Sequence, residues 1–253
     1  YGKLNGSSMK WYENGQMSSK YYYSKGIPDG LGTAWYENGK KSIEATYKNG
    51  KRHGLYTTWY ENENKSSEST YKNGNLEGLS IAWHQNGKKS SEGTYKSDKR
   101  YGSYTIWYEN GLKSWEYFFN DNGTRDSNRF TTRWWENGKK RYRGYVKTLD
   151  SVAVWHGHYE SWDSTGAKIK EIKYSLGKKL FEFDYKDGEK VYFKGFHING
   201  HKKEEGDFEE NKRNGSWINY DNKGIKTSYG KYKNGLMDGV WYVKSSKKNS
   251  FKR

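Results

Sequence analysis

The stretch Trp35–Tyr60 reads WYENGKKSIEATYKNGKRHGLYTTWY, and it begins and ends on the same Trp-Tyr dipeptide. Its tryptophans, Trp35 and Trp59, stand 24 residues apart. The same unit recurs at this spacing at Trp11, Trp83 and Trp107. A short, fixed period is the sequence signature of a repeat array, in which each unit packs mainly on its neighbours. The 253-residue chain is therefore predicted to be an array of short repeats.

Three positions of the repeat can be followed along most of the chain. The tryptophan column consists of Trp11, Trp35, Trp59, Trp83, Trp107, Trp134, Trp162, Phe196 and Tyr220. A turn glycine follows four residues later in every copy except the third, which has Glu63. A second aromatic column stands twelve residues after the first and comprises Tyr23, Tyr47, Tyr71, Tyr95, Phe119, Tyr174, Phe208 and Tyr232. These columns predict nine copies.

Asn-Gly turns separate the short aromatic runs, as in Tyr47-Lys48-Asn49-Gly50. Asn-Gly between such runs is the strongest local signal for a β-hairpin, because both residues tolerate positive φ. Turns this frequent exclude helices. Each repeat of about 24 residues is therefore predicted to contain two strands and two turns, which makes the fold all-β, an array of antiparallel hairpins.

The loop Glu37–Gly39 decides which residues share a face of the sheet. As a three-residue loop with Gly39 in a left-handed bulge, it would place Trp35 opposite Lys41, and Thr33 opposite Ile43. One face would then hold Trp35, Thr33, Ile43, Ala45 and Tyr47, and the other Tyr36, Ser42, Glu44 and Thr46. A two-residue loop would instead group Trp35 with Ser42 and Glu44, and Tyr47 with Tyr36. We expect the bulged loop, because it collects the aromatic and apolar residues on one face.

A small residue stands two positions before the second aromatic column in several repeats. These small residues are Ala45, Ser69, Gly93, Gly206 and Gly230. A side chain of this size leaves room for a ring from a neighbouring strand, so we expect a tryptophan to lie across it.

The composition is polar, yet it does not indicate disorder. Aromatic residues make up 18% of the chain, with 12 Trp and 25 Tyr, and half-buried sheets are built from such residues. The net charge of +16 favours acidic partners, but lysines also keep a long sheet soluble and protect its edges. The absence of cysteine excludes disulfides and the usual structural zinc sites.

The compartment is unknown from the residues alone. No apolar run is long enough to span a membrane, and no signal peptide is visible. The chain starts at Tyr1 and not at Met, so we expect its native N-terminus to be missing. This slightly favours a secreted or cell-envelope location.

Regularity divides the chain into four predicted segments. Residues 1–120 hold the regular repeats, 121–200 hold irregular repeats with insertions, 201–243 hold the terminal repeats, and 244–253 form a basic tail running on from a last strand into disorder. The register is expected to break between Lys178 and Gly200, where turn glycines come unusually close together. Losing one strand there would exchange the two faces for everything that follows.

The unit Tyr-Lys-Asn-Gly-Lys-x-x-Gly-x-x-x-x-Trp-Tyr-Glu-Asn-Gly-Lys resembles the MORN-repeat variant family, which includes the bacterial YwqK-type antitoxin proteins. The best matches are Tyr47–Lys65, Tyr71–Lys88 and Tyr23–Lys40, and the resemblance extends over roughly residues 9 to 242. It implies an elongated array forming a single twisted sheet with a groove along one side. It also implies binding without catalysis: protein–protein contacts, membrane-associated scaffolding or, in some relatives, neutralisation of a toxin, which would place the chain in the cytoplasm.

Two motifs bear on catalysis or metal binding. A glutamate recurs five residues after the turn glycine, at Glu44, Glu68, Glu92, Glu116, Glu171 and Glu205. Stacked carboxylates can serve as an acid–base pair, but a repeated column is better explained by pairing with lysines on the neighbouring strand. His156 and His158 are half of a metal site, and spacing places no third ligand. We therefore predict no enzyme activity, no metal and no cofactor.

The aromatic ladder is the candidate binding feature. Most of the tryptophan column is explained as sheet core, whereas the second ring of each Trp-Tyr pair is a better candidate for an exposed face. The predicted partner-binding residues are Tyr12, Trp35, Tyr36, Trp59, Tyr60, Trp83, Trp107 and Tyr108. Rings interleaved with lysine can stack on partner side chains, sugars or bases. The leading hypothesis is a scaffold that binds another protein. The alternatives are an envelope module binding an acidic glycan, a lipid headgroup or another polyanion, and an antitoxin; sequence-specific nucleic-acid binding is not expected.

Overall fold

The computed structural model describes residues 3–150 and 152–244, and the backbone of residues 251–252. The chain divides into two compact units, residues 1–124 and 125–253. Only strands, turns and loops occur in these described residues, so they include no helix able to span a membrane.

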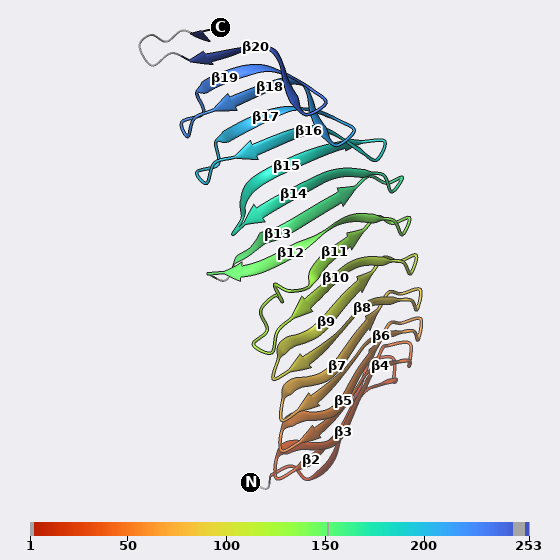
Figure 1. Ribbon diagram of the computed structural model, residues 1–253. Helices are drawn as coiled ribbons and strands as arrows, with labels where there is room; N and C mark the ends of the chain where they lie inside the picture. The colour runs from red at the N-terminus through yellow and green to blue at the C-terminus, as the bar shows by residue number, and fades with distance from the viewer. Residues whose placement is uncertain (1–2, 151, 245–250, 253) are drawn as a thin grey trace. The chain divides into compact units, whose positions relative to one another are not determined.

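The first unit is an open sheet in which each strand pairs antiparallel with the next one along the chain (Figure 1). Its strands are β1 (Gly6–Trp11), β2 (Met17–Ser24), β3 (Ile27–Trp35), β4 (Lys41–Lys48), β5 (Lys51–Trp59), β6 (Lys65–Lys72), β7 (Asn75–Trp83), β8 (Lys89–Lys96), β9 (Lys99–Trp107) and β10 (Lys113–Phe119).

The second unit is built in the same way. Its strands are β11 (Phe130–Trp134), β12 (Lys140–Leu149), β13 (Val152–Trp162), β14 (Lys168–Ser175), β15 (Lys178–Lys186), β16 (Glu189–Phe196), β17 (Lys202–Glu209), β18 (Lys212–Tyr220), β19 (Lys226–Lys233), β20 (Leu236–Lys244) and β21 (Phe251–Lys252). The all-β prediction of antiparallel hairpins is confirmed. Within the predicted basic tail, Lys252 pairs with Val243 of β20. Residues 245–250 and 253 of that tail lie outside the described residues.

Two kinds of connection alternate along the array. Asn49 and Gly50, with φ of 51° and 78°, form the two-residue turn between β4 and β5. At the other edge, the amide of Tyr36 donates to the carbonyl of Lys40 at 2.8 Å, and the Gly39 amide donates to the Tyr36 carbonyl at 2.9 Å. Gly39 has a φ of 80°. This is the expected three-residue loop with a left-handed glycine.

The predicted sharing of faces was wrong. Trp35 does lie opposite Lys41, but Thr33 lies opposite Glu44, and Ile43 lies opposite Ala34. Because the ladder shifts at this point, one residue of β4 is left without a partner, and every residue beyond it changes face. The grouping of Trp35 with Glu44, expected for a two-residue loop, is the one observed, although a bulge and not the loop length produces it.

The two aromatic columns consequently lie on opposite sides of the sheet. We call the side that carries Trp35, Thr33, Lys41 and Glu44 with their equivalents the tryptophan face. The side that carries Gly32, Ile43, Ala45 and Tyr47 with their equivalents is the tyrosine face.

The small residues lie beneath rings on the tyrosine face. Ala45 is 1% exposed. A Cβ built on Gly206 would come within 2.5 Å of the Trp217 ring, and one on Gly230 within 2.5 Å of Trp241. The expected packing of tryptophan over a small residue is therefore present in the second unit. In the first unit a tyrosine takes this place, as Tyr104 does over Gly93.

The repeat changes phase in the second unit. The two-residue turn Asp187–Gly188 joins β15 to β16, where the alternation of connections predicts a three-residue loop. The three-residue loop comes one strand later, between β16 and β17. Glu171 lies opposite Phe183, which lies opposite Phe193. A row of acidic residues thus continues as an aromatic row, because β15 has a two-residue turn at each end.

Candidate interaction surface

The eight predicted partner-binding residues lie along one edge of the first unit. The tryptophans end β3, β5, β7 and β9. Each tyrosine begins the loop after a strand that ends on a tryptophan, and these strands are β1, β3, β5 and β9. All eight side chains are half-buried. Trp11, the first tryptophan of the array, is more exposed than these four tryptophans, at 57%. The eight residues therefore form one band of rings in the structure, and part of each ring is buried within the fold.

The loop tyrosines join successive repeats through their hydroxyl groups. Tyr12 donates to the carbonyl of Trp35 at 2.7 Å, and Tyr36 donates to the carbonyl of Trp59 at 2.6 Å. Tyr60 donates to the carbonyl of Trp83 at 2.8 Å. Other donors take this position elsewhere, namely the rings of His84, Trp135 and His197. The column is thus defined by a ring carrying a donor that reaches a backbone acceptor in the next repeat.

Asparagines in the same loops form a second ladder. The side chain of Asn14 donates to the carbonyl of Glu37, and that of Asn86 donates to the carbonyl of Glu109, both at 2.8 Å. The Oδ1 of Asn86 also accepts from the amide of Lys88 at 3.0 Å. One asparagine therefore shapes its own loop and holds the next one, which makes this edge of the sheet regular.

Lysines lie between the tryptophans on the tryptophan face. The ammonium of Lys41 is 5.2 Å from the ring centroid of Trp59, and that of Lys65 is 5.8 Å from the ring centroid of Trp83. A cation at such a distance is attracted by the ring quadrupole. The remaining ring surface and the lysine stems form the outer part of this band.

The same lysines neutralise the glutamate column. Lys41 pairs with Glu44 at 2.7 Å, and the pattern holds in all six copies of the column. Pairing with lysine was expected, but its predicted place on the neighbouring strand was wrong. The partner is three residues earlier on the same strand, because the bulge at residue 42 brings positions i and i+3 to one face.

Electrostatics at Glu171 favour the ionised carboxylate. Burial by itself raises the pKa of Glu171, but the Tyr185 hydroxyl and the Lys168 ammonium outweigh it and lower that pKa. Lys168 thus holds the Glu171 carboxylate ionised, as expected for an ion pair that is part of the fold. Over the described ranges 3–150 and 152–244, no group of three His, Asp or Glu side chains could hold a metal ion.

A leucine stripe on the tryptophan face has no counterpart among the predicted site residues. Leu31, Leu55 and Leu79 are 45%, 52% and 48% exposed. Each lies opposite a threonine and two residues before the buried row that contains Thr33 and Thr57. With two strands per repeat, neighbouring leucines are about 10 Å apart. The sequence signal was a leucine directly after a glycine within the strand, as in Gly54-Leu55, where Gly54 stands four residues beyond the turn glycine Gly50.

The tyrosine face is packed more closely and carries arginine. The guanidinium of Arg52 lies 4.3 Å from the ring centroid of Tyr56 and 5.3 Å from that of Tyr71. Tyr56 and Tyr71 also meet edge to face, with centroids 5.9 Å apart. Through these contacts, the rings of the second aromatic column pack as part of the core on the tyrosine face.

Comparisons with known proteins support the repeat assignment. No curated protein matches the chain. Two solved structures, titled "Crystal Structure of TcdB2-TccC3-TEV" and "Crystal Structure of TcdB2-TccC3-Cdc42", align with 94% and 95% of this chain at 11% and 8% identity. The chain spans only 15% and 17% of their lengths, and the TM-scores of 0.23 and 0.18 are too low to bear on fold or function. Four tandem segments of the first unit, residues 4–25, 28–49, 52–73 and 76–97, match the family described as MORN repeat variant, one hairpin to each segment.

Proposed function

We propose that this protein is a non-catalytic scaffold that binds another protein through the tryptophan face of its first unit. A MORN repeat array is typically a binding scaffold, and four repeats of this kind lie in that unit. The observation that carries the proposal is the leucine stripe, since three leucines in register are each about half exposed. Regularly placed exposed apolar groups on a polar protein are a usual mark of a protein interface.

The surroundings of the stripe suit a protein partner. Beside it run the glutamates and then the band of tryptophan rings and lysine stems, so an apolar strip is bordered by aromatic and charged groups. Interfaces combine an apolar centre with a polar rim in this way. Four lysines of this face, Lys41, Lys65, Lys89 and Lys113, are each paired with a glutamate, which makes the face a poorer match for a polyanion. Neutralising a toxin would be one form of the proposed activity.

The test compares two triple variants with equal numbers of substituted leucines. Leu31, Leu55 and Leu79 are changed to serine in one variant. The control changes Leu112, Leu149 and Leu176, whose exposures of 44%, 42% and 45% are similar. Affinity capture at low salt and at about 0.5 M salt should return a protein partner with the wild type and the control, and lose it with the stripe variant. Capture of nucleic acid, glycan or lipid that weakens steeply with salt would overturn the proposal.

A further inference from the structure

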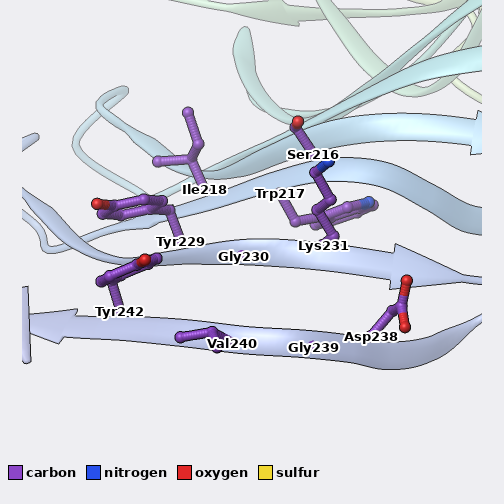
Figure 2. Close-up of a pocket in the computed structure, with 10 residues that line it drawn as sticks. All are labelled: Ser216, Trp217, Ile218, Tyr229, Gly230, Lys231, Asp238, Gly239, Val240 and Tyr242. Carbon is purple, nitrogen blue, oxygen red and sulfur yellow. The ribbon is translucent and has the colours of Figure 1, made fainter. Parts of the chain in front are cut away.

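A groove of about 540 Å³ lies on one face of β18, β19 and β20 in the second unit. Figure 2 shows its two ends. Ile218, Tyr229 and Tyr242 lie together at one end, and Ser216, Lys231 and Asp238 lie at the other. Its volume falls in the usual range for small-molecule sites, about 300–1,000 Å³.

Strand register places both ends of the groove on the same face. Ile218 lies opposite Tyr229, which lies opposite Tyr242, so these side chains form one row across three strands. Ser216 lies opposite Lys231, which lies opposite Asp238, and this second row runs parallel to the first. On β18 and β19 the residues of the two rows are two apart along the strand and share a face. On β20, Asp238 and Tyr242 are four apart, across an irregularity of the ladder, and they line the same hollow.

Between the two rows, the position of Gly230 faces the opposite side of the sheet, where a Cβ would meet the ring of Trp241. Gly230 stands between Tyr229 and Lys231 and has no side chain. Its other side is closed by the ring of Trp241, whose Nε1 donates to the carbonyl of Lys231 at 3.3 Å. The groove therefore has the backbone at Gly230 as its floor, and the Trp241 ring lies behind that backbone.

The walls depart from the repeat in ways the fold does not require. Tyr229 occupies the position of the glutamate column, so Lys226 has no carboxylate three residues later. Its ammonium lies instead 4.8 Å from the ring centroid of Tyr229. The rings of Tyr229 and Tyr242 stack at 4.8 Å with planes 13° apart. Where earlier repeats carry an exposed leucine such as Leu55, this one has Ser216. An aromatic ring thus replaces the carboxylate of the glutamate column, and a serine replaces the larger leucine beside it.

The polar end carries one positive and one negative group. Lys231 and Asp238 are cross-strand neighbours, and both are exposed. They form no ion pair with each other or with any other residue that the structure describes. Cross-strand charges of opposite sign usually stabilise a sheet by pairing, so a separated pair beside an aromatic wall is suited to a ligand that carries both charges.

We propose that this groove binds a free α-amino acid with an aromatic or large aliphatic side chain. The carboxylate pairs with Lys231, the ammonium pairs with Asp238, and the side chain lies against Tyr242 and Ile218. The shared requirement for two charges and an apolar body excludes simple acids and simple amines. This binding site lies in the second unit and is independent of the function proposed for the first.

The experiment titrates the full chain, labelled with ¹⁵N, with four probes. The probes are L-phenylalanine, 3-phenylpropionate, phenethylamine and glycine. We expect L-phenylalanine to shift the amides of Gly230 and Gly239 saturably with a millimolar Kd. The acid and the amine each lack one charge and should bind at least about threefold more weakly, as expected for loss of one exposed charge pair. Glycine keeps both charges but lacks the ring, and it should also bind at least about threefold more weakly.

Two variants localise the binding, and two more serve as controls. Lys231→Gln should weaken L-phenylalanine binding about two- to fivefold, and Tyr242→Ala should weaken it about fivefold. Tyr242→Phe keeps the ring and should bind normally, which guards against a folding defect in the alanine variant. Lys186→Gln, an exposed lysine on β15, is the matched control and should have no effect. Absence of saturable shifts at these glycines, equal binding by either singly charged probe, or binding unaffected by Lys231→Gln would each overturn the proposal.

Discussion

The hydroxyl of Tyr36 donates a 2.6 Å hydrogen bond to the backbone carbonyl of Trp59, one repeat further along the chain. The donor thus lies in one hairpin and the acceptor in the next. Together with the equivalent bonds of Tyr12 and Tyr60, it makes the first unit a series of hairpins held at a common edge. Stability should therefore be transmitted between neighbours and be nearly additive along the array.

Removing one such hydroxyl should weaken the first unit measurably. We expect Tyr36→Phe to lower the free energy of unfolding by about 1 kcal/mol, because the ring stays and one hydrogen bond is lost. Urea unfolding followed by tryptophan fluorescence measures the change. Tyr22→Phe is the control, since Tyr22 is 41% exposed and its loss of a hydroxyl should change stability by less than about 0.5 kcal/mol. Equal effects in both variants would contradict the proposed role of Tyr36.

Two tryptophans of the array should differ in their effect on stability. Trp217 is 1% exposed and packs on Phe193 and Phe208, so Trp217→Ala should cost about 3–5 kcal/mol. Trp59 is half-buried, and we expect Trp59→Ala to cost about 2 kcal/mol, since less surface leaves water when it folds. Denaturant unfolding of both variants makes the comparison. A larger loss for Trp59→Ala would mean that the tryptophan face, and not the tyrosine face, is the main core.

The contact between Gly206 and Trp217 gives a sharper test of packing. A Cβ at Gly206 would lie 2.5 Å from ring carbons of Trp217, so Gly206→Ala should destabilise the second unit by about 1–3 kcal/mol. At Gly195 the nearest atom is the flexible Cγ of Glu204 at 3.1 Å. Gly195→Ala should therefore cost clearly less. Thermal unfolding of the two variants would contradict this account if their midpoints fell equally.

The second unit should lose stability at high pH. Burial, together with the hydrogen bond to the Glu205 carboxylate and the negative charge of that group, raises the pKa of Tyr192 to about 12 from an ordinary value of 10. A phenol whose folded pKa exceeds its unfolded pKa contributes stability that is complete below pH 10 and is lost as the pH rises through 12.

Spectrophotometric titration of tyrosinate and unfolding curves between pH 9 and 12 measure this effect. Tyr192→Phe should reduce the loss of stability across that window, whereas Tyr22→Phe should leave it unchanged. An identical alkaline loss in the Tyr192→Phe variant would show that another group is responsible.

Much of the architecture could be predicted from short stretches of sequence, because the turns depend on local residue types. Asn49-Gly50 and Gly39 specify their turns because the left-handed backbone conformation is accessible to few residue types. The close spacing of the turn glycines Gly177, Gly188 and Gly200 likewise indicated that the repeat changes phase there, since each turn type has its own length. In the structure, the candidate rings lie on one edge because they flank these loops.

The repeat period, the two turn types, the all-β class and the phase change were determined by the sequence alone, because each depends on residues within a few positions of one another. The tertiary structure decided which face each side chain takes and what it contacts. The bulge at Ser42 forms only against β3, and it separates Thr33 from Ile43 and brings Lys41 to Glu44. The acceptor of the Tyr36 hydroxyl is likewise 23 residues away, and only the stacking of one hairpin on the next brings it within hydrogen-bonding distance.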